Sequence, residues 1–174
     1  FNAMINPVIP YGIKGFIWYQ GEANDADAYN YRKLFPMMIN DWRQRWHQGN
    51  LPFLYVQLAN FKKAKPLPSE SEWAELREAQ LKALSVPNTA MTVNIDLGEW
   101  NDIHPDNKKD VGERLALTAL KLAYHENVIH SGPSLLSSEI KDHQIILIYL
   151  LHELKILPDL LNKLDHHHKF FHSR

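Results

Sequence analysis

Short apolar runs alternate with segments of helical periodicity over residues 13–125 of the chain. Runs rich in aromatic and β-branched residues, at 13–19, 53–58 and 89–96, predict three buried strands. Apolar residues at spacings of three and four predict helices over about 27–46, 72–84 and 107–125. This regular alternation predicts an α/β fold with a parallel sheet and right-handed crossovers.

The first two predicted helices each divide into a buried and an exposed side. Pro36 lies inside the apolar stripe of the first helix, so we expect that helix to kink or restart there. Asp25 or Asp27 can cap its start, and a capping box over residues 69–72 can start the second helix. We place four charged residues on the exposed side of the first helix, as solvated groups: Arg32, Lys33, Arg43 and Arg45. One face of the second helix is expected to carry Trp73, Leu76, Gln80 and Leu84.

The pattern changes after residue 131. Residues 139–149 predict a strand, residues 150–164 a leucine-rich helix, and residues 165–174 are rich in histidine. We therefore expect one domain over residues 1–138 and a divergent tail over 139–174. We expect no metal site in the tail, because adjacent histidines diverge and no second ligand pair at a suitable spacing is evident; a zinc-binding tail is the weaker alternative. The histidines concerned are His166, His167, His168 and His172.

Composition bounds the class of protein without identifying it. A chain of 174 residues with 45% apolar and 22% charged residues is enough for one globular domain. A net charge of -1 gives no electrostatic reason to expect nucleic acid or an anionic membrane as a partner. Without cysteine there is no disulfide and no thiolate nucleophile. No apolar run predicts a membrane span and no signal-peptide pattern is present; because the sequence opens on Phe1, we expect a fragment of a longer protein.

Two polar segments directly follow predicted strands. Gln20, Gly21 and Glu22 come after the first strand, where Gln20 can offer a side-chain amide donor. The loop after the third strand contains Asp102 and His104. Ligands of open α/β sheets bind at the carboxyl ends of the strands, so these segments are the candidate site.

Six ordered motifs make the sequence recognisable. They are W-Y-Q-G-E-A-N, A-Y-N-Y-R-K-L-F-P, D-W-R-Q-R-W, P-F-L-Y-V-Q-L-A-N-F, W-A-E-L-R-E-A-Q and N-D-I-H-P-D-N-K. Together they resemble the sialate O-acetylesterases, a branch of the SGNH-type carbohydrate esterases, over about Phe1 to Ser138. The resemblance implies a three-layer SGNH-hydrolase-like parallel sheet, incomplete here because the first strand, with its nucleophile, is missing. It also implies a periplasmic or secreted full-length protein.

The resemblance implies removal of O-acetyl groups from sialic acid or a related acetylated sugar by acyl transfer to serine, without a cofactor. His104 matches the family's catalytic histidine segment. The wider SGNH pattern has aspartate three residues before the histidine, where this chain has Asn101. The orienting group is therefore Asp102, reaching back from a turn, or else Asn101 or a backbone carbonyl in a dyad.

By the same resemblance, Gln20 and Gly21 form the oxyanion loop. Glu22 and Asn24 are expected to hold that loop or to contact the sugar. Trp100 is the stronger aromatic candidate for a substrate contact, with Asn101 beside it.

The expected nucleophile is absent from the sequence. The family's serine lies in a Gly-Gln-Ser-Asn segment, which does not occur in these 174 residues, and the serines present are typical of caps and loops. An esterase whose nucleophile lies elsewhere is therefore one interpretation. The alternative is an inactive truncated fragment with at most weak carbohydrate binding.

Overall fold

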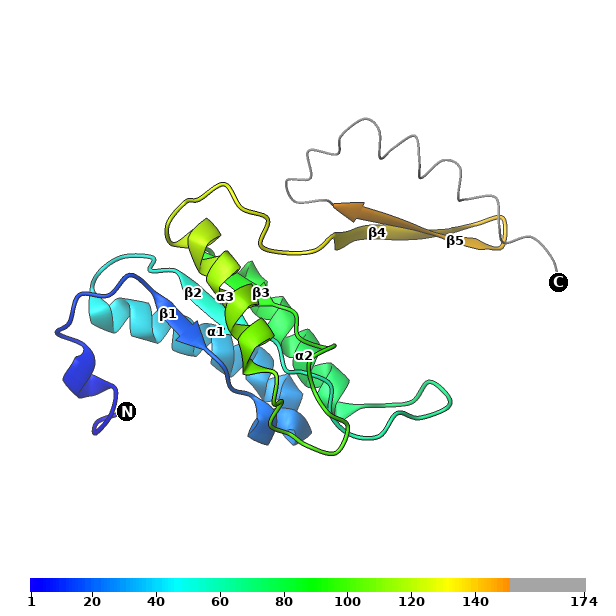
Figure 1. Cartoon of the computed structure of the whole chain (residues 1–174), viewed down its shortest axis with the longest axis horizontal. Helices are drawn as coiled ribbons and strands as arrows, with labels where there is room; N and C mark the ends of the chain where they lie inside the picture. Colours follow the sequence, from blue (N-terminus) through cyan, green and yellow to red (C-terminus); the bar gives the residue numbers. More distant parts are fainter. Residues whose placement is uncertain (151–174) are drawn as a thin grey trace. The chain divides into compact units, whose positions relative to one another are not determined.

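The computed structural model describes residues 1–150 of the chain, which divides into two compact units, Phe1–Ser131 and Gly132–Arg174 (Figure 1). The predicted histidine-rich end and the predicted leucine-rich helix beyond residue 150 lie outside the described residues. No helix within residues 1–150 is long and apolar enough to cross a bilayer.

The first unit contains a three-stranded parallel sheet in the order β1-β2-β3. The strands are β1 (Phe16–Trp18), β2 (Phe53–Val56) and β3 (Thr89–Thr92). All four residues of β2 are buried, which is the pattern of a central parallel strand covered on both faces. The predicted parallel sheet is confirmed.

Three α-helices cover the sheet: α1 (Ala28–Trp46), α2 (Glu72–Lys82) and α3 (Lys108–Leu122). Figure 1 shows α1 and α2 on one face of the sheet and α3 on the other, which makes three layers. Same-handed crossovers from β1 to β2 and from β2 to β3 place α1 and α2 on one side. Three short 3-10 helices complete the unit: η1 (Asn6–Val8), η2 (Glu22–Asp27) and η3 (Ala83–Ser85).

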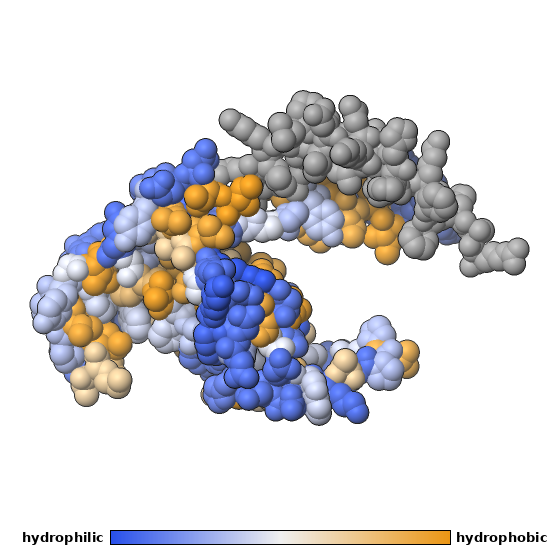
Figure 2. Space-filling view, in the orientation of Figure 1, coloured by the Kyte–Doolittle hydropathy of each residue, from blue (hydrophilic) through white to orange (hydrophobic). Residues whose placement is uncertain are grey.

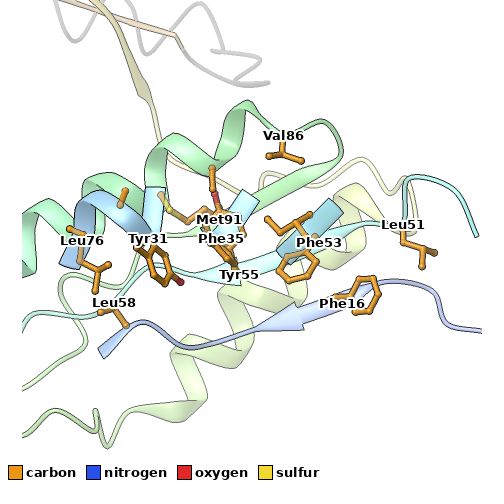
Figure 3. Close-up of a cluster of buried hydrophobic side chains, with 14 of the residues drawn as sticks. Phe16, Tyr31, Phe35, Leu51, Phe53, Tyr55, Leu58, Leu76, Val86 and Met91 are labelled. Carbon is orange, nitrogen blue, oxygen red and sulfur yellow. The ribbon is translucent and has the colours of Figure 1, made fainter. Parts of the chain in front are cut away.

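The core lies between the sheet and the pair α1 and α2, and it combines aromatic and aliphatic side chains (Figure 3). The rings of Phe35 and Tyr55 meet edge to face with centroids 4.9 Å apart, and Phe16 meets Trp46 in the same way at 5.0 Å. Such pairs contribute beyond their buried area. Aromatic packing therefore fixes α1 against β1 and β2.

Several predicted details of the helices change in the structure. A restart at Pro36 does not occur, because α1 is one helix in which Phe35 and Ile39 pack in the core on either side. Asp27 occupies the N-cap position of α1 without a side-chain capping bond, whereas Ser71 caps α2 through the amide of Ala74. The placement of Leu84 on the buried face is wrong. That residue lies in η3, where the tighter turn rotates it outward, and it is 41% exposed.

The placement of Arg43 on the exposed side of α1 is also wrong. Its side chain is buried and donates three hydrogen bonds to main-chain carbonyls: Nε to Leu51 at 2.9 Å, Nη1 to Pro87 at 2.8 Å and Nη2 to Asn88 at 2.7 Å. Burial lowers the pKa of the guanidinium. Arg43 thus joins the segments that lead into β2 and β3 from the end of α1.

An ion pair attaches α3 to the segment that follows β3. Arg114 donates to both carboxylate oxygens of Asp96, at 2.7 and 2.6 Å, and to the carbonyl of Val93 at 2.7 Å. The hydrogen bond from Arg114 lowers the pKa of Asp96 from 3.8 to about 2.

The second unit contains an antiparallel hairpin of β4 (Ser134–Lys141) and β5 (Gln144–Leu150). The predicted single strand over 139–149 is wrong, because Asp142 and His143 adopt positive φ angles of 48° and 62° and form a two-residue turn. Both strands are exposed along their length, and Figure 2 shows apolar residues at the hairpin surface. Ser138, where we expected the first domain to end, lies within β4.

Replacing Arg43 tests the buried hydrogen bonds. Arg43→Leu should lower the free energy of unfolding by about 3 kcal/mol, because three carbonyls lose a charged donor. Urea denaturation measures the change. The matched variant Arg45→Leu removes an exposed guanidinium from the same helix and should have a far smaller effect. Equal losses in the two variants would contradict the role of Arg43.

The ion pair on α3 predicts a pH-dependent contribution to stability. Because the folded-state pKa of Asp96 is depressed, the pair stabilises fully above the ordinary value of 3.8, and this contribution is lost as the pH falls toward about 2. The difference in unfolding free energy between the wild type and Asp96→Asn should therefore shrink as the pH falls below about 4. Urea midpoints measured at several pH values test this, and a difference that does not vary with pH would refute it.

Candidate functional site

The candidate site lies at the carboxyl edge of the sheet, where three segments follow the three parallel strands. Residues 20–24 follow β1, residues 57–61 follow β2, and residues 94–104 follow β3. Because parallel strands end at the same edge, the fold brings these segments together. An ion pair of 2.6 Å between Asp25 and Lys62, the residues that directly follow the first two segments, joins these two parts of the chain.

Gln20 is held in place by hydrogen bonds within its own loop and to α1. Its side-chain Nε2 donates to Asn24 Oδ1 at 2.8 Å. The Tyr31 hydroxyl lies 3.3 Å from the main-chain oxygen of Gln20 and 3.4 Å from its Oε1. Burial, the largest cause, raises the pKa of Tyr31 to about 12, so the hydroxyl stays a donor at neutral pH. The second Nε2 proton of Gln20 has no acceptor among the described residues.

Gly21 adopts a backbone conformation that side chains disfavour. Its φ is 150°, and a Cβ there would lie 3.3 Å from Gln80 Nε2 and 3.5 Å from Leu58 Cδ1. Glu22 follows as the first residue of η2, and the amide of Asn24 donates to the Gly21 carbonyl at 2.8 Å. The turn after β1 therefore needs glycine at this position.

Gln80 on α2 joins the ends of β1 and β2, a role that the sequence analysis missed. Its side chain is fully buried, its Oε1 accepts from the Leu58 amide at 2.9 Å, and its Nε2 lies 3.2 Å from the Gln20 carbonyl and 3.4 Å from that of Val56. Its main-chain carbonyl accepts from the Tyr55 hydroxyl at 2.8 Å. The available signal was an amide on the apolar face of a predicted helix, which requires polar partners when buried.

Asn60 connects the end of β2 to the loop that carries Asp102 and His104. Its Oδ1 accepts from the amide of Gly98 at 2.7 Å. A Cβ at Gly98 would collide with the Asn60 carbonyl oxygen, so the two segments approach as closely as backbone allows. The neighbouring Ala59 carbonyl accepts from Trp73 Nε1 at 2.8 Å, which fixes this segment to α2.

Asp102 and His104 lie together in an exposed turn. The Asp102 carboxylate accepts from the main-chain amide of His104 at 2.8 Å, and the same Oδ1 lies 3.6 Å from His104 Nδ1. That second distance is too long for a hydrogen bond. The two side chains are 55% and 84% exposed. Asp102 Oδ1 thus lies near the imidazole of His104 without a hydrogen bond to it.

The two remaining residues predicted for this loop, Trp100 and Asn101, directly precede Asp102 in the chain. Trp100 is 59% exposed and Asn101 is exposed. Beyond the turn, Lys108 Nζ lies 5.5 Å from the ring centroid of Tyr19, which brings the start of α3 to the end of β1. Burial, and then the charge of Glu22, raise the pKa of Tyr19.

Within residues 1–150, no group of three or more histidine, cysteine or acidic side chains is arranged to hold a metal ion. The predicted histidine cluster of the tail lies outside these residues.

The known proteins to which this chain is similar are sialate and carbohydrate acetylesterases. Residues 2–121 match the family described as carbohydrate esterase, sialic acid-specific acetylesterase. The mouse sialate O-acetylesterase is 37% identical over 76% of this chain and 28% of its own length, and the human one is 36% identical over 76% and 29%. The chain thus spans less than a third of these relatives.

A solved structure extends the likeness to the fold. The crystal structure of a carbohydrate acetylesterase from Xanthomonas citri superposes with a TM-score of 0.81 at 46% identity, covering 86% of this chain and 35% of that one. This match confirms the predicted SGNH-like α/β fold. The motifs, the parallel sheet and these matches agree, and the chain belongs to the family of sialic acid-specific carbohydrate acetylesterases.

Proposed function

We propose that residues 1–131 supply the histidine and oxyanion side of an active site that removes O-acetyl groups from sialic acid or a related acetylated sugar. The observation that supports this most directly is the placement of the Gln20 loop and the Asp102–His104 turn at one edge of the sheet. Family membership supports O-deacetylation in general.

In this proposal a serine hydroxyl attacks the acetyl carbonyl carbon while His104 Nε2 takes the hydroxyl proton. The sugar oxygen then leaves with that proton, and an acetyl-serine remains. Water attacks this ester, His104 takes a proton from the water and returns it to the serine, and acetic acid is released.

Gln20 would stabilise the oxyanion that forms in each of these steps. Its bond to Asn24 orients the amide and leaves one proton for the developing negative charge. A donor of this kind contributes about 3 kcal/mol to transition-state stabilisation. Asp102 would orient His104 after closing the 3.6 Å gap to Nδ1.

The serine would come from a segment outside residues 1–150. The serines among those residues lie just before α2 (Ser69 and its N-cap Ser71), in η3 and from Ser131 onward, and none of them directly follows β1, β2 or β3. An inactive fragment that binds carbohydrate weakly remains the competing function, and activity measured in a complete domain distinguishes the two.

A chimera provides that complete domain. The part of the Xanthomonas citri acetylesterase that corresponds to residues 1–131 of this chain would be replaced by those residues, and release of acetate from O-acetylated sialic acid would be measured. The chimera should be active and the 174-residue chain alone should not. His104→Asn should lower kcat by about a thousandfold or more, and Gln20→Ala by about a hundredfold.

His125→Asn is the matched control, because His125 is an exposed histidine after the end of α3. It should leave activity unchanged. A folded chimera with only background activity would support the inactive fragment, and full activity in His104→Asn would remove that residue from the mechanism.

A further inference from the structure

A groove of about 640 Å³ lies between the segment after β2, the N-terminal half of α2 and the segment after β3. Its lining includes Asn60 from the first, Arg77 from the second and Ile95 from the third. Since Asn60 also holds Gly98 in the loop that leads to His104, the groove adjoins the candidate site.

Arg77 is a partly buried cation in this groove whose guanidinium has no partner among the described residues. Its backbone is fixed, because Gln57 Nε2 donates to the Arg77 carbonyl at 3.0 Å. Burial lowers the pKa of the side chain, and no anion offsets that burial. A cation whose charged form is disfavoured by partial burial gains from an anionic partner.

The other arginines that are partly or fully buried in residues 1–150 all have acceptors. Arg32 pairs with Glu78 at 2.8 Å, Arg114 pairs with Asp96, and Arg43 binds three carbonyls. Arg77 is therefore the exception among the described residues.

The rest of the groove carries both charges. Lys62 is already paired with Asp25 and lies 3.8 Å from Glu72. The exposed side chains of Glu70 and Glu75 line the groove without an ion pair to Arg77. Carboxylates accept hydrogen bonds from sugar hydroxyls, so this mixture suits a sugar that itself carries an acid group.

We propose that Arg77 binds the carboxylate of an acidic sugar, with the hydroxyls of that sugar facing Glu70 and Glu75. The planar guanidinium matches a carboxylate with two parallel hydrogen bonds. The inference rests on the proposed function, because the sugar bound in the groove is the one whose acetyl ester would reach His104.

Ligand binding by the 174-residue chain tests this without any need for a serine nucleophile. Nitrogen-15 NMR titration would compare the methyl glycoside of N-acetylneuraminic acid with the methyl ester of the same glycoside. The free acid should bind about tenfold more tightly and shift the Arg77 Nε resonance. Acetate alone, at the same concentrations, should not reproduce the shift.

Substitutions of Arg77 separate its charge from its shape. Arg77→Gln should reduce the affinity for the acid to that for the ester. Arg77→Lys should give an intermediate affinity, because lysine keeps the positive charge but lacks the planar guanidinium that donates two parallel hydrogen bonds. Arg45→Gln, an exposed arginine on α1, should leave the preference unchanged. Circular dichroism confirms that each variant is folded.

Three results would overturn the proposal: no binding of either glycoside, equal binding of acid and ester by the wild type, or an unchanged preference in Arg77→Gln. The comparison of acid and ester requires no variant, so an unfolded Arg77→Gln would not leave the question open. An inactive chimera with intact acid binding would count against the proposed function alone. An active chimera without acid preference would count against the groove alone.

Discussion

The buried amide of Gln80 is the interaction on which the carboxyl edge of the sheet depends. A single side chain from α2 binds the main chain after β1, at Gln20, and the main chain of the segment after β2, at Leu58. Strand ends expose amides and carbonyls that the sheet no longer pairs, and burying them unpaired is costly. Gln80 pairs some of these groups, so the Gln20 loop starts from a fixed point.

At the amino ends of the strands, main-chain groups must also be paired, and there an arginine pairs them. Arg43 reaches the carbonyls of Leu51, Pro87 and Asn88, where the chain enters β2 and β3. Three converging acceptors favour a guanidinium, whereas the mixed donors and acceptors around Gln80 favour an amide. Side chains from the helices on one face therefore hold β2 at both ends, β1 at its carboxyl end and β3 at its amino end.

The sequence predicted the elements that depend on local pattern. The runs at 53–58 and 89–96, and the helical spacing around Trp73, are found as β2, β3 and α2 because apolar periodicity and burial agree there. The errors fall on residues whose environment is made by distant segments. Arg43 is charged and lies on a helix, so pattern alone places it in solvent, yet its acceptors are 8 to 45 residues away along the chain.

In the candidate site too, features set by the local sequence could be predicted and features set by distant segments could not. The position of Gln20, Asp102 and His104 after strands was readable from sequence, because topology alone carries strand ends to one edge. The hydrogen bonds of the Gln80 side chain and the close approach of Gly98 to Asn60 could not be predicted from the sequence, since both depend on how α2 and two loops pack together.

The exposure of His104 has a consequence for how catalysis would work. Electrostatic stabilisation by Gln20 and by an Asp102–His104 pair is strong only where water is excluded, and in water the attraction between two charges 4 Å apart is about 1 kcal/mol. With His104 84% exposed and Asp102 3.6 Å from Nδ1, the turn does not by itself supply that environment. A segment that brought the serine to His104 would also have to cover the imidazole and draw Asp102 into hydrogen-bonding distance. In the proposed enzyme, the segment that supplies the serine therefore also excludes water from the site. The Gln20 loop and the Asp102–His104 turn would form the part of the site that this segment covers.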